Sequence, residues 1–147
     1  MITKNTKRVK MRISIWLMLV TLVPLLVCAE QIETTIVSEV LVKSTQIWDG
    51  SELPLYPEGQ PEVTILRITI PAGAKIPLHQ HPYINAGVLL KGELTVLTQT
   101  GDELIITAGE QIIELVNKWH LGENSGNVSA EIIVFYAGIK GQPITVK

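Results

Sequence analysis

The chain has 147 residues, of which 46% are hydrophobic and 18% are charged. This length suits one domain, and the apolar content can supply a sizeable core, which argues against disorder. The net charge is −2, and no basic run exists beyond the first residues, which argues against nucleic acid as a partner.

The first 29 residues have the order of a secretory signal peptide. Five basic residues without an acidic one come first, and an apolar run over residues 13–27 follows. Ala29 is a suitable small residue for cleavage, so we expect a mature chain that starts at Glu30 and is exported, either periplasmic or secreted. A membrane anchor is the alternative, but the run is shorter than the ~20 residues needed to span a bilayer and contains Pro24.

Cys28 is the only cysteine, and it lies inside the predicted signal peptide. A lipid on Cys28 is a further alternative, although Val27 is a poor match for the small residue that usually precedes such a cysteine. After ordinary cleavage no cysteine remains, which excludes a disulfide and a thiolate ligand. Cleavage also lowers Lys and Arg from 12 to 7 against 14 Asp and Glu, a net charge of −7. This charge suits an exported protein without stable membrane insertion.

From residue 30 onward the sequence predicts β-structure throughout. Residues 31–48 are expected to pair as an outer strand or to supply a partner chain, and the three prolines of residues 51–62 indicate a loop. Short runs rich in Val, Ile and Thr follow between turn signals, and none keeps helical spacing. These runs predict strands over residues 62–70, 87–90, 92–100, 102–109, 110–116 and 130–138. Residues 30–147 are therefore expected to form one all-β domain, a sandwich or a barrel.

Two of the three histidines, His79 and His81, are separated by one residue. In a strand successive side chains alternate between faces, so both point to the same side, about 7 Å apart along the chain. Pro77 and Pro82 bracket the pair and restrict its backbone. If the shared side is a barrel interior, the two imidazoles can bind one metal ion. The alternative is a pair of exposed histidines on an edge strand.

The spacing around this pair resembles that of the cupin family. Five residues separate Gly73 from His79, three separate His81 from Asn85, and six separate Asn85 from Gly92. The pattern is similar to the first cupin motif, G(X)5HXH(X)3,4E(X)6G, with Asn85 in the place of its Glu.

A second spacing, around His120, is similar to the second cupin motif, G(X)5PXG(X)2H(X)3N. Gly109, His120 and Asn124 occupy matching positions, whereas Leu115 replaces the Pro and Asn117 replaces a Gly. Asn tolerates a left-handed backbone better than most residues, so the last exchange is mild. The resemblance covers about residues 63–146. It implies a small single-domain cupin, a jelly-roll barrel (double-stranded β-helix) with a metal inside.

Carried over by position, the resemblance implies that His79, His81 and His120 are the metal ligands. Asn85 lies at the remaining ligand position, where it either coordinates weakly or only makes a hydrogen bond. Neutral ligands would leave the charge of the ion uncompensated and several coordination positions open, as in catalytic sites. Zn, Ni, Fe and Cu remain open as the metal.

Candidates for acid–base chemistry are few. Glu93 and Glu114 are interpreted as solvent-facing strand residues, Trp119 as a packing residue and Tyr136 as part of the core rim. Tyr83 is a further candidate because it lies close to the first motif.

Three hypotheses of function follow. The chain is an exported metal-dependent cupin that acts on a small molecule, with an oxygen-dependent dioxygenase as one class of reaction. Alternatively, it is a non-catalytic module that binds a small ligand or a metal, or its motifs serve the fold alone. The intact histidine trio argues against the last hypothesis and does not separate the first two. The family also implies a homodimer, with the apolar residues 36–42 as the pairing edge.

Overall fold

The computed structural model describes residues 34–147, and the predicted signal peptide lies outside them. Residues 38–147 form one unit of eight β-strands in two four-stranded antiparallel sheets. Within the described part of the chain, no helix is long and apolar enough to cross a membrane.

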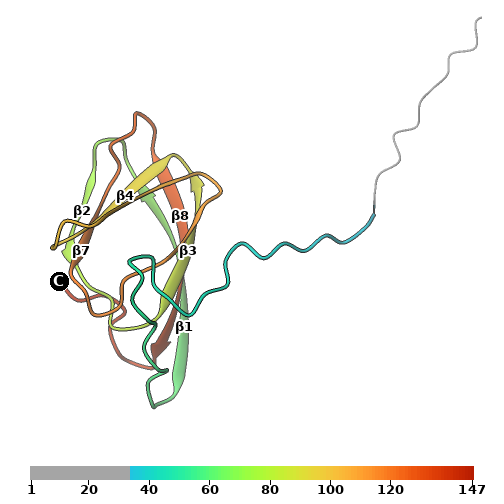
Figure 1. Ribbon diagram of the computed structural model, residues 1–147, viewed down its shortest axis with the longest axis vertical. Coiled ribbons are helices and arrows are strands. Elements are labelled where there is room, and N and C mark those ends of the chain that lie inside the picture. Colours follow the sequence, from blue (N-terminus) through green and yellow to red (C-terminus); the bar gives the residue numbers. More distant parts are fainter. Residues whose placement is uncertain (1–33) are drawn as a thin grey trace, which may run out of the picture. The chain divides into compact units, whose positions relative to one another are not determined.

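The two sheets face each other across the core (Figure 1). The first sheet has the order β1-β8-β3-β6, with β1 (Pro61–Ile70), β8 (Ala130–Ile139), β3 (Asn85–Lys91) and β6 (Gln111–Ile113). The second has the order β2-β7-β4-β5, with β2 (Lys75–His79), β7 (His120–Glu123), β4 (Glu93–Thr98) and β5 (Glu103–Thr107). The predicted all-β jelly-roll fold is confirmed.

Alternating burial along the strands explains why the sheets pack face to face. In β8, Ile132, Val134 and Tyr136 are buried, whereas Phe135 between them is exposed. The period of two sends alternate side chains to opposite faces of the sheet. The inward sets of both sheets form one apolar cluster, which includes Leu89, Leu94, Val96 and Ile106.

The outer strand expected over residues 31–48 is not present in the described part of that range. Residues 34–48 form no ladder with a sheet, and Gln46 makes only an isolated bridge with Glu52. The Ser44 hydroxyl donates to the Gln46 carbonyl and accepts from the Gln46 amide, which bends the chain locally. A high content of Val and Ile favours a strand, but a strand also needs a partner for its backbone groups.

The two asparagines of the second motif have structural roles. Asn117 is left-handed, with a φ of 56°, as its replacement of a motif glycine suggested, and its amide donates to the His81 carbonyl. Asn124 is fully buried, and its side-chain amide donates to the carbonyls of Ile70 and Val128. Both residues thereby fix the turns that lead into and out of β7.

Gly92 and Gly73 allow a paired test of the first motif. Both have positive φ, 77° and 73°, but a Cβ on Gly92 would lie 2.9 Å from the Cα of Ala130, whereas one on Gly73 meets nothing within 4 Å. We expect Gly73→Ala to lower the free energy of unfolding by about 1–2 kcal/mol, from backbone strain alone. Gly92→Ala should cost roughly 1–3 kcal/mol more because the backbone of β8 must move. Urea unfolding of both variants measures the difference, and equal losses would contradict the steric explanation.

Candidate metal centre

The fold brings the three predicted histidines together at one end of the second sheet. His79 ends β2 and pairs with His120 at the start of β7, while His81 makes a bridge with Val116. All three are buried, and one ring nitrogen of each lies within 4.8 Å of the others. With bonds of about 2.1 Å to an ion, ligands are separated by roughly 3–4 Å, so the cluster is close to the size that a metal requires.

Backbone carbonyls orient all three imidazoles in the same way. A carbonyl only accepts hydrogen bonds, so each Nδ1 carries the proton and each Nε2 keeps a free lone pair. The Nδ1 of His79 donates to the Pro77 carbonyl (2.7 Å). The Nδ1 of His81 donates to the Ile144 carbonyl (2.9 Å), and that of His120 to the Lys118 carbonyl (2.9 Å). This arrangement is typical of metal-binding histidines, whose second nitrogen fixes the tautomer. The Nε2 of His120 is buried without a hydrogen-bond partner among the described residues.

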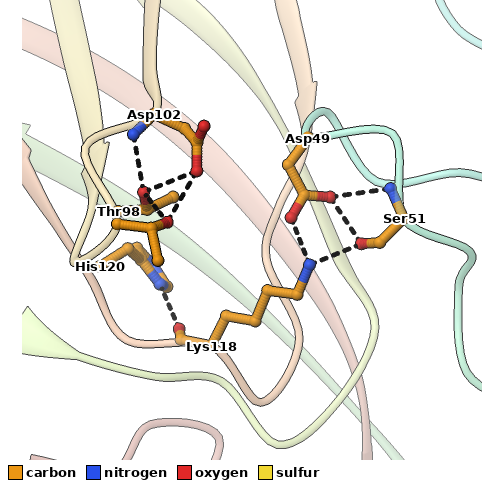
Figure 2. Close-up of polar contacts among 7 residues, drawn as sticks. Asp49, Ser51, Thr98, Asp102, Lys118 and His120 are labelled. Carbon is orange, nitrogen blue, oxygen red and sulfur yellow. Dashed lines mark hydrogen bonds and ion pairs between the residues drawn. The ribbon is translucent and has the colours of Figure 1, made fainter.

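A surface ion pair supports the segment that holds His120. The Nζ of Lys118 binds the carboxylate of Asp49, and it donates to the Ser51 hydroxyl at 2.9 Å (Figure 2). The backbone carbonyl of the same lysine accepts a hydrogen bond from the His120 ring. The loop that carries Asp49 and Ser51 thus helps to fix the orientation of the ligand.

Burial keeps these imidazoles neutral at physiological pH. It lowers the pKa of His81 to about 4 and the pKa of His120 to about 4, and it lowers the pKa of His79 as well. Desolvation disfavours the charged form, and the hydrogen bonds that the rings donate to backbone carbonyls only partly offset it. Neutral imidazole is the form that binds a metal.

Glu114 is not the solvent-facing strand residue that its sequence suggested. Its side chain is only 13% exposed, and its two carboxyl oxygens lie 3.7 Å from the Nε2 atoms of His81 and His120. Burial raises the pKa of Glu114 to about 7. The site therefore contains a carboxyl group beside the histidines.

A signal for Glu114 exists in the sequence. Ile112 and Glu114 are two residues apart, and Ile112 is buried in the core. Continuing the period of two past the end of β6 places Glu114 on the same interior face. Because a charged side chain usually faces solvent, Glu114 was expected on the outer face instead.

Asn85 is buried at the start of β3, on the same interior face. Its Nδ2 donates to the Tyr83 carbonyl at 3.2 Å, and its Oδ1 has no hydrogen-bond partner within residues 34–147. The amide is therefore held in place, with a free acceptor. Whether Asn85 coordinates an ion stays a prediction.

Tyr136 is the second acid–base candidate that reaches the site. It is buried opposite Asn85 in the β3–β8 ladder. Its ring lies edge-on to that of His81, with the two ring centroids 5.3 Å apart. Burial and then the nearby Glu114 raise the pKa of its hydroxyl. Tyr136 thus lies deeper than the rim of the core, whereas Tyr83, Glu93 and Trp119 do not line the cavity.

The histidines open into a cavity of about 200 Å³ between the sheets. This volume is below the roughly 300–1,000 Å³ of pockets for drug-sized ligands, so it suits a small molecule. Most of the wall is apolar, formed by Leu66, Ile68, Ile76, Leu94, Val96, Ile132 and Val134. Thr145 and Lys147 add polar groups.

The comparison with known families agrees with this geometry. Residues 66–136 match the family model described as "Cupin domain". Residues 66–136 form a cupin domain. The match lies inside the range of about 63–146 over which the two motifs resemble this family, and it includes all three histidines.

Solved structures with similarity to this chain were found at low sequence identity. An uncharacterised protein with a double-stranded β-helix domain from Klebsiella pneumoniae is 18% identical over 63% of this chain and 83% of its own, with a TM-score of 0.50. DMSP lyase DddQ from Ruegeria pomeroyi is 20% identical over 57% of this chain and 42% of its own, with a TM-score of 0.50. Oxalate oxidase in complex with glycolate is 25% identical over 57% of this chain and 45% of its own, with a TM-score of 0.49.

The cupin matches only part of the two enzymes, because it spans less than half the length of each. None of these similarities defines an activity for this chain. No curated protein sequence matched it.

Proposed function

We propose that this cupin binds a divalent transition metal through His79, His81 and His120 and acts on a small molecule as an oxygen-dependent dioxygenase. The observation that carries the proposal is the common orientation of the three rings. Each Nδ1 donates to a backbone carbonyl, and one ring nitrogen of each histidine lies within 4.8 Å of the others beside an apolar cavity. A structural histidine needs no such convergence.

The remaining residues suit chemistry on a small substrate. When bound, an ion of Fe, Ni or Cu would supply redox chemistry and open coordination positions, whereas Zn has no redox chemistry. The apolar wall binds the body of the substrate and excludes water from the reacting groups. Glu114 places a carboxyl group beside His81 and His120. These features favour a substrate with an apolar body and an oxygen donor at one end.

Metal analysis and oxygen uptake test the proposal together. Untagged protein prepared without chelator should contain about one divalent ion per chain. In an oxygen electrode, with small carboxylic acids and catechols as probes, we expect uptake that stops after chelation and returns with Fe(II), Ni(II) or Cu(II). An anaerobic control checks that product formation requires oxygen. Tight binding of the probes without uptake would instead identify a non-catalytic binding module.

We also propose that the protein is exported to the periplasm or secreted. The proposal rests on the basic, apolar and small-residue order of residues 1–29, which lie outside the described residues. N-terminal sequencing should find Glu30 first. A retained Met1, or a lipid on Cys28, would contradict cleavage after Ala29.

A homodimer is proposed from the outer face of the first sheet. Ile65 and Phe135 are directly opposite each other in the β1–β8 ladder, and they are 63% and 44% exposed. The exposed apolar residues 40–42 line a groove over β3 and β8 on the same sheet. Contiguous apolar surface of this kind marks an interface, and a second copy can cover it symmetrically. Sedimentation should show a dimer that Ile65→Lys dissociates, and a monomeric wild type would contradict the proposal.

A further inference from the structure

The first motif of this cupin has lost its acidic residue. Asn85 is neutral, so the three histidines and Asn85 together bring no negative charge to a divalent ion. We propose that Glu114 supplies the missing carboxylate ligand from the neighbouring strand. This inference rests on the three-histidine metal site proposed above.

The ladder between β3 and β6 places the two residues side by side. Ala86 pairs with Ile113, and the next step of the register brings Asn85 opposite Glu114. The Glu114 amide donates to the Asn85 carbonyl at 3.1 Å, which confirms that the pairing continues past the end of β6. Opposed residues of an antiparallel pair point to the same face, with Cβ atoms about 5 Å apart. The Glu114 carboxylate therefore lies one strand away from Asn85 and faces the same interior.

The carboxyl oxygens of Glu114 also reach the right atoms. One is 3.7 Å from the Nε2 of His81, and the other is 3.7 Å from the Nε2 of His120. Two ligands of one ion, each bonded at about 2.1 Å, are separated by roughly 3–4 Å. Both Nε2 atoms are the free ones, because the Nδ1 atoms are bound to carbonyls. Glu114 thus lies at ligand distance from the binding nitrogens of two histidines.

The carboxylate explains how the cavity can hold a divalent ion. Burying a charge in an apolar site is costly unless an opposite charge compensates it. Glu114 offsets one of the two positive charges and provides an oxygen donor, which harder ions such as Mn(II) and Fe(II) prefer. Wild-type selectivity should therefore be that of a three-histidine, one-carboxylate site.

Titration with metal tests the assignment directly. Chelator-treated wild type, Glu114→Gln, Glu93→Gln and His81→Ala are titrated calorimetrically with Mn(II), Ni(II) and Zn(II), each alone. Glu114→Gln keeps the size of the side chain and removes the anion. We expect at least tenfold weaker binding of Mn(II), with a smaller loss for Ni(II) and Zn(II). Glu93 also lies on a strand, but it does not line the cavity, so Glu93→Gln should bind as the wild type does.

The other variants separate the possible failures. Adding Asn85→Glu to Glu114→Gln returns an anion to the same face and should recover Mn(II) affinity, which also shows that the first substitution did not unfold the site. If Glu114→Gln binds all three ions within twofold of the wild type while His81→Ala loses them, the role of Glu114 is overturned and the histidine site stands. If neither wild type nor variants bind any of the ions, both proposals are overturned.

Discussion

Replacing His81 by alanine is expected to abolish the stabilisation of this cupin by metal. An ion that binds only the folded state at a hundred times its dissociation constant adds about 2.7 kcal/mol to the free energy of unfolding. For a domain of this size, that gain raises the Tm by roughly 10 °C. His81 is buried between His79, His120 and Glu114, so its loss removes a central ligand.

The measurement is the change in Tm on adding Ni(II) or Zn(II), taken separately for each variant. Removing the imidazole also leaves a hole and the Ile144 carbonyl without its partner, which lowers the Tm of the metal-free variant. Comparing each protein with its own metal-free form cancels that effect. An equal metal-induced rise in wild type and His81→Ala would show that His81 is not a ligand.

Replacing Glu114 by glutamine is expected to stabilise the metal-free protein at alkaline pH. Burial raises the pKa of Glu114 to about 7, from an ordinary value of 4.5. The folded state therefore holds the proton more tightly than the unfolded state does. Stability from this group is fully present below pH 4.5 and is lost as the pH rises to about 7. At pH 8 the loss amounts to roughly 3–4 kcal/mol, because each pKa unit corresponds to about 1.4 kcal/mol.

Glutamine has no proton to lose, so the variant avoids this cost. Urea unfolding of chelator-treated protein should show Glu114→Gln to be more stable than the wild type at pH 8, with the difference gone near pH 4.5. Glu93→Gln is the matched control, since Glu93 lies outside the cavity. No gain at pH 8 would mean that Glu114 is solvated when the metal is absent.

The two effects of Glu114→Gln have opposite signs. The variant should gain stability without metal and lose affinity for metal, a combination that general damage to the fold cannot produce. A buried carboxyl that costs stability and improves binding is typical of functional sites, where stability is exchanged for function.

The histidine pair and its family could be predicted because they depend on local spacing. Alternation along a strand puts His79 and His81 on one face whatever the strand packs against. The left-handed Asn117 could also be anticipated, since a motif glycine is replaced by the residue type that best tolerates this backbone. Six of the eight strands from residue 61 onward followed from their β-branched composition and turn signals, whereas β2 and β7 were not among the predicted runs.

Other features depended on partners that the sequence does not name. Residues 34–48 have the composition of a strand, but they form no ladder with either sheet in the structure, and composition cannot report a missing partner. Tyr136 was expected at the rim of the core, and the β3–β8 register places it opposite Asn85 beside His81. Packing decided both outcomes.

Glu114 shows most clearly what the tertiary structure decides. The sequence predicted the fold, the grouping of the three histidines and a neutral residue, Asn85, where the cupin motif has an acid. Only the pairing of β3 with β6 showed that another acid lies across the ladder. Strand register is set by long-range hydrogen bonds and by the buried faces of both partners, so no local pattern around Glu114 could reveal its neighbour.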